Sequence, residues 1–110
     1  MARYTNLFTA NDSIGSLRQA LVETLKACDL NLIYETKDYL VAREKPGGVA
    51  FTKLATIEVL INPPRGTSHT AQVNLVVKNE ELPLKRDNHC QRVFDLVNQA
   101  IADANGWQVA

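Results

Sequence analysis

The chain has 110 residues, and its 12 Lys and Arg residues balance its 12 Asp and Glu residues. This length is typical of one domain, and the contents of 45% hydrophobic and 22% charged residues are close to globular averages. The balanced charge excludes an overall attraction to nucleic acid or to an anionic membrane. No apolar run approaches the roughly 20 residues that a membrane-spanning helix needs. We therefore expect a single domain over residues 1–110 whose partner is neither a nucleic acid nor a membrane.

The first residues and the two cysteines indicate the compartment. Residues 1–10 lack the basic stretch followed by an apolar stretch that marks a secretory signal. Cys28 and Cys90 lie within apolar periodic patterns and lack the close spacing of a metal or redox motif. A disulfide between them would need Cα atoms within about 7 Å, and a reducing compartment disfavours it. We expect a cytoplasmic protein in which both thiols are buried and reduced.

Alternating apolar and polar residues predict a first strand over residues 3–9. A helix is expected over residues 13–28, because residues 11–13 are Asn, Asp and Ser, whose side chains can accept hydrogen bonds from free backbone amides. Apolar residues then recur at helical spacing, at Ile14, Leu17, Leu21, Leu25 and Cys28. Gly15 in the first turn indicates either a specific close contact or, as the favoured reading, a frayed turn.

From residue 30 the apolar period changes to two, which predicts a hairpin of strands 30–35 and 39–43 with a tight polar turn between them. Leu30, Leu32 and Tyr34 are expected on one face of this hairpin. The chain is then expected to reverse at residues 45–48, where one proline and two glycines favour a turn. With Lys45 and Lys53 nearby, this segment could hold a phosphate. It lacks the spacing of a P-loop or dinucleotide fingerprint, so a plain turn is favoured.

The longest predicted strand runs from Val49 to Ile61. Its inward residues, expected to face the helices, are Ala55, Ile57, Val59 and Ile61. Residues 62–68 contain two prolines and a glycine and therefore predict an exposed loop. A fifth strand is expected over residues 69–78, with Ala71, Val73, Leu75 and Val77 inward.

The last predicted element is a helix that Asp87 or Asn88 can cap. Its apolar stripe consists of Cys90, Val93, Phe94, Val97, Ile101 and Ala104. Asn105 and Gly106 favour a left-handed stop, after which Trp107 could fold back onto the helix end.

Four successive strands joined by short connections predict an antiparallel meander, because a parallel pair needs a crossover of a dozen or more residues. One apolar sheet face must be covered, so we expect a two-layer α+β fold with both helices on that face. The order strand, helix, four strands, helix is similar to the helix-grip and TBP-like arrangement. This resemblance covers nearly the whole chain and concerns architecture only. It implies that the first strand pairs with the fifth, in the spatial order 1-5-4-3-2.

His89 and Cys90, with Asp87 nearby, are the residues that most suggest a metal site or a nucleophile with its base. Adjacent residues on a helix point about 100° apart, so His89 and Cys90 do not converge on one ion. The favoured interpretation is a buried Cys90 in the apolar stripe and a surface His89. We expect no catalytic residue, no metal and no cofactor.

The outer face of the sheet is the main candidate surface, because polar side chains there alternate with Leu54, Leu60 and Val76. The entrance to the last helix carries the densest positive charge, which Glu80 and Glu81 largely offset. The candidate interaction residues are Thr52, Thr56, Arg65, Gln72, Asn74, Lys85, Arg86 and Arg92.

The leading functional hypothesis is a small non-enzymatic binding or assembly module, which would bind a protein partner or associate with itself. The alternative is a carrier of a small apolar ligand such as a lipid or pigment, with a cavity lined by Tyr34 and Phe94. An enzyme using Tyr39, His69 or His89 is less favoured, because no spacing supports it. Nucleic-acid binding is also less favoured, because the predicted outer face shows no aromatic stacking pair among Lys and Arg residues.

Overall fold

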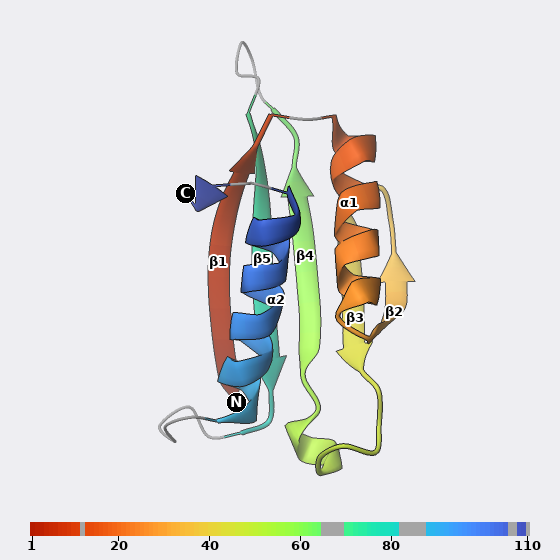
Figure 1. The fold of residues 1–110 in the computed structure, drawn as a ribbon, viewed down its shortest axis with the longest axis vertical. Helices are drawn as coiled ribbons and strands as arrows, with labels where there is room; N and C mark the ends of the chain where they lie inside the picture. Colours follow the sequence, from red (N-terminus) through yellow and green to blue (C-terminus); the bar gives the residue numbers. More distant parts are fainter. Residues whose placement is uncertain (12, 65–69, 82–87, 106–107, 110) are drawn as a thin grey trace.

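The computed structural model describes residues 1–11, 13–64, 70–81, 88–105 and 108–109. In this part of the chain, strands form one antiparallel sheet in the order β2-β3-β4-β5-β1-β6, and two α-helices cover it (Figure 1). The strands are β1 (Ala2–Ala10), β2 (Leu30–Glu35), β3 (Tyr39–Glu44), β4 (Thr56–Asn62), β5 (Ala71–Asn79) and β6 (Gln108–Val109). The helices are α1 (Ile14–Ala27), the short 3₁₀ helix η1 (Phe51–Lys53) and α2 (His89–Asn105).

The predicted α+β fold and strand order are confirmed. β1 pairs antiparallel with β5 along its whole length, from Ala2 opposite Asn79 to Ala10 opposite Ala71. The remaining pairs follow the meander, so β2 lies at one edge of the sheet. The sequence did not predict β6, which pairs with Phe8 and Thr9 at the other edge. α2 ends at Asn105, where the stop was predicted. The other residues of that prediction, Gly106 and Trp107, lie outside the described residues.

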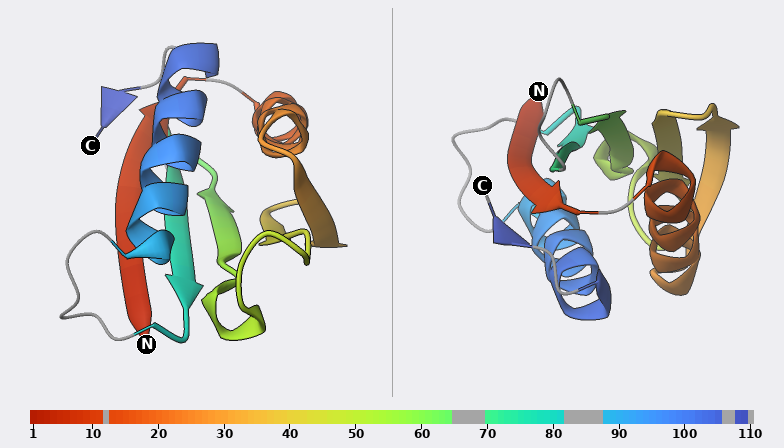
Figure 2. Two further views of the ribbon diagram at one scale, coloured as in Figure 1. Left: turned by 60° about the horizontal axis from the view of Figure 1, so that its bottom comes forward. Right: turned by 90° about the horizontal axis from the view of Figure 1, so that it is seen from above.

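Both α-helices lie on the same side of the sheet, as predicted (Figure 2). α2 packs against β1 and β5, whereas α1 packs against β2 and β4. α1 begins where the Ser13 hydroxyl accepts a hydrogen bond from the Ser16 amide at 3.3 Å, as expected for an N-cap serine. Among the described residues, neither helix has the length and apolar character required to cross a membrane.

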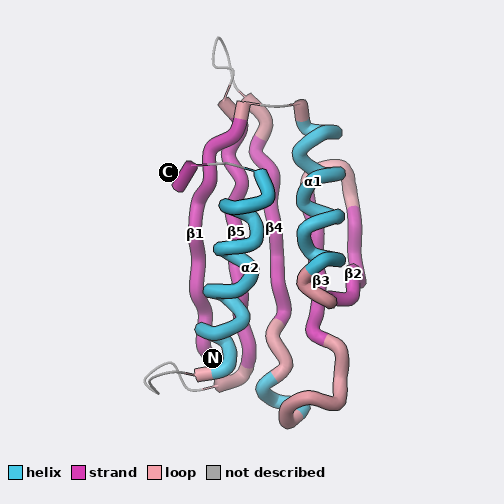
Figure 3. The backbone as a smooth tube through the Cα atoms, viewed as in Figure 1, coloured by secondary structure: helices cyan, strands magenta, loops and turns pink. Residues whose placement is uncertain are grey.

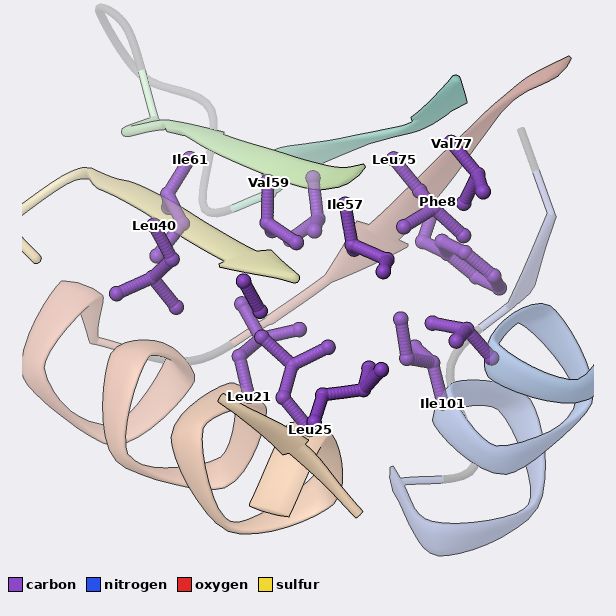
Figure 4. Packing of buried hydrophobic residues seen from close by; sticks show 14 of the residues in the cluster. Phe8, Leu21, Leu25, Leu40, Ile57, Val59, Ile61, Leu75, Val77 and Ile101 are labelled. Carbon is purple, nitrogen blue, oxygen red and sulfur yellow. The ribbon is translucent and has the colours of Figure 1, made fainter. Parts of the chain in front are cut away.

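The core fills the space between the helices and one face of the sheet. Phe8 and Leu75 come from the sheet, Leu21 from α1 and Ile101 from α2, and their side chains point toward one another (Figure 4). The inward positions predicted for the fourth and fifth strands are all buried, namely Ala55, Ile57, Val59, Ile61, Ala71, Val73, Leu75 and Val77. The alternation of these strands therefore assigns the apolar face of the sheet correctly.

The predicted strand over residues 49–61 is wrong in its first half. Phe51–Lys53 forms η1 at the end of the molecule (Figure 3), where the Lys53 amide donates to the carbonyl of Ala50 at 2.8 Å. Leu54 and Ala55 are both buried, although consecutive residues of a strand point to opposite faces. Leu54 does not belong to the core cluster beneath the helices. It is buried beside Arg43, Thr56 and Lys78, on the side of the sheet where it was expected.

A bulge in β2 overturns the predicted position of Tyr34. Leu30 pairs with Glu44 and Leu32 with Ala42, but Tyr34 pairs with Val41, so the register shifts between Leu32 and Tyr34. An extra residue in one strand changes the face toward which the next side chain points. Tyr34 therefore leaves the face of Leu30 and Leu32 and is 53% exposed on the other side of the sheet.

Two glycines have different roles. Gly47 has φ +116°, a conformation that glycine adopts without steric cost, so the predicted reversal after β3 is confirmed. A Cβ atom added to Gly15 would meet nothing within 4 Å. Gly15 therefore makes no close contact with the described residues, so the alternative of a specific close contact is wrong.

We expect Leu→Ala to lower stability strongly on the inner face of the sheet and to change it little on the outer face. Leu75→Ala removes a fully buried side chain and should lower the free energy of unfolding by about 2–5 kcal/mol. Leu60→Ala, at a position that is 41% exposed, should change it by about 0.5 kcal/mol or less. Urea denaturation of both variants measures the difference. Equal losses would contradict the assignment of the two faces.

Candidate interaction surface

The outer face of the sheet, opposite α1 and α2, is defined by the side chains of β1 to β5 that point away from the helices. No element within the described residues covers it (Figure 2). The strand registers arrange its side chains in rows that cross the strands. Each row consists of residues that are directly paired across neighbouring strands, so their side chains point to the same side of the sheet.

The first row is basic and crosses five strands. Arg3 pairs with Lys78, Lys78 with Thr56, Thr56 with Arg43, and Arg43 with Asn31. Three of its five members are cations, on β1, β5 and β3, and none is an anion. We call these five residues the basic row.

The next two rows form the centre of the outer face. One consists of Leu7, Asn74, Leu60 and Tyr39, and the other of Thr5, Val76, Glu58, Val41 and Tyr34. Residues of both rows, with Arg3, line a depression of about 700 Å³. We call these two rows the central rows. They carry most of the apolar surface of the outer face, and a last, polar row of Thr9, Gln72 and Asn62 borders them.

Glu58 is the anion of the central rows, and its charge is held by neighbours. The Tyr39 hydroxyl donates to Glu58 Oε1 at 2.9 Å, and Lys78 Nζ lies 3.2 Å from the same oxygen. The hydrogen bond to Glu58, with smaller contributions from burial and from the charge of Glu58, raises the pKa of Tyr39 above its usual 10.0. Tyr39 therefore stays a neutral donor, and its ring meets that of Tyr34 edge-on at 5.9 Å.

The structure brings part of the predicted site together. Thr56, Gln72 and Asn74 share the outer face, and Thr52 in η1 lies at the end of that face beside Thr56. Arg92 belongs to α2 and is exposed on the opposite side of the sheet. The remaining predicted residues, Arg65, Lys85 and Arg86, lie outside the described residues.

Sequence reasoning missed the residues that give the outer face its character. Arg3 and Arg43 had a readable signal, because each alternates with inward residues of a predicted strand. Leu7 had the same signal. Tyr34 did not, because the bulge that turns it outward depends on the pairing of β2 with β3.

A second polar cluster lies at the start of α2. The Asn88 side chain accepts from the Gln91 amide at 2.7 Å, which confirms the predicted capping by Asn88. Asn88 also donates to the Tyr4 hydroxyl at 2.7 Å, so the cap ties α2 to β1. Glu81 accepts hydrogen bonds from the backbone amides of His89 and Cys90 at 3.3 and 2.9 Å. A carboxylate at this position also interacts favourably with the helix dipole.

The same contacts alter the acidity of Glu81. Burial raises its pKa, but hydrogen bonds from the Asn79 side chain and from the Cys90 and His89 amides, together with the charge of Lys53, lower it more. The net pKa lies below the usual 4.5. From the sequence, Glu81 was expected only to offset nearby positive charge. In the structure it also stabilises the first turn of α2.

His89 and Cys90 serve the fold. The Cys90 thiol is buried, and its single S–H has the carbonyls of Val77 and Ala2 as possible acceptors at 3.5 and 3.8 Å. Burial and the charges of Glu81 and Glu44 raise the pKa of Cys90 to about 11, which disfavours the reactive thiolate. His89 is not the surface residue that the sequence predicted. It is half-buried, with Nε2 2.7 Å from Glu44 Oε1, and this carboxylate also accepts from the Ala55 amide.

Within the described residues, no cluster of three or more His, Cys, Asp or Glu side chains could hold a metal ion. Cys28 and Cys90 are both free cysteines, half-buried and buried respectively. Burial raises the pKa of Cys28. The prediction of two buried thiols is therefore correct for Cys90 alone.

The apolar cavity expected between the sheet and the last helix does not include Tyr34. That residue lies on the outer face, whereas Phe94 packs on the inner side against Tyr4, with ring centroids 5.7 Å apart. On the inner side, a groove between the end of α1 and α2 is lined by residues such as Cys28, Val93 and Val97. Its volume is about 170 Å³, which is smaller than the roughly 300–1,000 Å³ of typical ligand pockets.

No model of a known protein family matches this sequence, and no curated protein shows significant similarity to it.

The contacts of Glu81 predict a pH-dependent loss of stability in Glu81→Gln. At pH 7 this change removes a charge and an acceptor from the start of α2 and should cost about 1–3 kcal/mol. Because the folded-state pKa of Glu81 is lowered, its stabilisation is complete above the unfolded value of 4.5 and is lost as the pH falls through the folded value. The deficit relative to wild type should therefore shrink in acid.

Glu80→Gln is the matched control, since Glu80 is exposed and its side chain makes no hydrogen bond within the described residues. Thermal unfolding of the three proteins between pH 7 and pH 3 measures the effect. A Glu81→Gln deficit that is absent at pH 7, or that does not change with pH, would contradict this role.

Proposed function

We propose that this protein is a small non-enzymatic binding module that docks a protein partner on the central rows and the basic row of its outer face. One observation carries the proposal: apolar and polar side chains together line a depression in an uncovered sheet face, and a row of cations adjoins it. Apolar, aromatic and Arg side chains at the centre of a surface are typical of protein interfaces.

The exposure of individual residues supports this use of the face. Leu60 is 41% and Tyr34 53% exposed, and both side chains lie on the outer face. Neighbouring polar residues such as Asn74 and Gln72 supply hydrogen-bonding groups around them. An apolar centre with a polar rim is the usual anatomy of a docking surface.

The charges favour a different protein over a second copy of this chain. A copy docked face to face would present its own outer face, in which the basic row contains no anion and Glu58 is already held by Lys78 and Tyr39. Within the basic row and the central rows, it therefore offers no unpaired carboxylate to Arg3 and Arg43. We infer a partner with apolar side chains flanked by acidic residues, since complementary charges give specificity and speed association.

A non-enzymatic role in the cytoplasm accords with the side chains that could react. His89, Cys90 and Glu81 are engaged in holding α2 to the sheet. Both cysteines are free, as is usual in a reducing compartment. Tyr39 is held as a neutral hydrogen-bond donor by Glu58.

The experiment compares two identical substitutions on opposite sides of the molecule. Leu60→Asp places a charge in the central rows, whereas Leu96→Asp does so on α2, where Leu96 is 58% exposed. Tagged wild-type and variant chains are recovered from the native cell. A stoichiometric protein found with wild type and with Leu96→Asp is then purified and titrated against all three chains by calorimetry. We expect Leu60→Asp to weaken this binding at least tenfold and Leu96→Asp to change it less than twofold.

Circular dichroism first establishes that both variants are folded. Equal affinity of the two variants would overturn the proposed surface. Recovery of a chain that associates only with itself would overturn the choice of partner, and a monomer without a partner under all growth conditions would overturn the function.

A further inference from the structure

Arg43 occupies an unusual position at the end of the outer face. It lies in β3, in the basic row, where it pairs with Thr56 of β4. Its guanidinium lies over the ring of Phe51, with 5.1 Å between Cζ and the ring centroid. Phe51 belongs to η1 and is 70% exposed. The solvent-exposed ring of Phe51 thus packs against the guanidinium of Arg43.

The Arg43 guanidinium has no acceptor among the described residues. Its Nε atom is enclosed and makes no hydrogen bond, and the side chain takes part in none of the ion pairs. Arg18 is different, because it pairs with Glu35. Guanidinium N–H groups that are removed from water ordinarily have an acceptor. The described residues therefore provide no oxygen acceptor for the Arg43 guanidinium.

A hollow of about 180 Å³ adjoins Arg43. Thr52, Thr56 and Lys78 also line it, and the hydroxyls of both threonines make no hydrogen bond within the described residues. The volume is below the roughly 300–1,000 Å³ of pockets for drug-sized molecules, so it suits a small group. The donors around it are a guanidinium, two hydroxyls and an ammonium, which together suit an oxyanion.

The lining of this hollow carries two cations, Arg43 and Lys78, and one carboxylate, Glu80. Glu58 is held by Lys78 at 3.2 Å and by the Tyr39 hydroxyl. Glu80 also lines the hollow and is exposed. Lys78 is balanced by Glu58, whereas no ion pair between Arg43 and Glu80 is formed among the described residues. A second cation, Arg3, lies next to Lys78 in the basic row.

We propose that the hollow beside Arg43 is an oxyanion site that binds a phosphoryl or carboxylate group. Because Nε is enclosed, the anion accepts hydrogen bonds from the N–H groups on Nη1 and Nη2, and the hydroxyls of Thr52 and Thr56 add neutral donors. Phe51 holds the plane of the guanidinium in place, so little side-chain freedom is lost on binding. The site goes beyond the proposed docking function, since it requires no protein partner.

The test is a titration of the ¹⁵N-labelled full chain with inorganic phosphate and, separately, with acetate. Sodium chloride keeps the ionic strength constant, because screening alone alters weak charge interactions. We expect the Arg43 side-chain Nε–Hε signal and the Thr52 and Thr56 amide signals to shift together and to saturate, while the Arg18 Nε–Hε signal stays unchanged. Arg43→Gln should weaken the binding at least tenfold, and Arg18→Gln should leave it within twofold of wild type.

Arg43→Lys is a second variant that retains the charge but not the guanidinium, and it should also weaken binding. If Arg43→Gln does not fold, this variant and the wild-type signals decide the question. Saturation with phosphate alone identifies a phosphoryl ligand, and saturation with acetate alone identifies a carboxylate. Saturation with both supports a general oxyanion site. Linear shifts with both anions, or equal binding by Arg43→Gln, would overturn the proposal.

Discussion

The structure depends on the burial of one face of a single sheet beneath two helices. Phe8, Leu75 and Ile57 on the sheet, with Leu21 on α1, belong to one buried cluster, and such apolar burial supplies most of the favourable free energy of a domain of this size. Because α1 and α2 both lie on this side (Figure 2), the other face is left to solvent. The outer face, where we propose that a partner docks, is thus left available by the way the core is made.

The start of α2 shows how polar residues can resemble a reactive site while serving the fold. A helix leaves its first backbone amides without partners, and here Glu81 and Asn88 accept from three of them. The same residues connect α2 to β5 and β1 through Asn79 and Tyr4. Cys90 and His89 are part of this attachment of α2 to the sheet. Their contacts with Glu81 and Glu44 are explained by that structural role. On the outer face, Arg43 is different: its guanidinium rests on Phe51 and has no acceptor among the described residues.

The sequence predicted the parts of the fold that local periodicity determines. The alternation in β5 identified its inward residues, and Asn88 was recognisable as a cap. The misses arise from pairing. In β2, six residues from Leu30 to Glu35 oppose five from Leu40 to Glu44, so one must bulge, and no pattern within β2 alone reveals this. The strand predicted from Val49 begins only at Thr56, because Phe51–Lys53 forms η1 instead. The candidate surface was consequently predicted in location but without Tyr34, Arg43 or Arg3.

The central claim is that the inner face is sealed while the outer face is free for a ligand in the isolated chain. Solvent paramagnetic relaxation of methyl signals, measured with a soluble gadolinium chelate, tests it most directly. Leu60 and Leu75 are suitable because they have the same side chain and lie on adjacent strands, β4 and β5, facing opposite sides. The account predicts strong relaxation of the Leu60 methyls and little of those of Leu75. Equal protection of both leucines would show that the outer face is covered and would contradict the account.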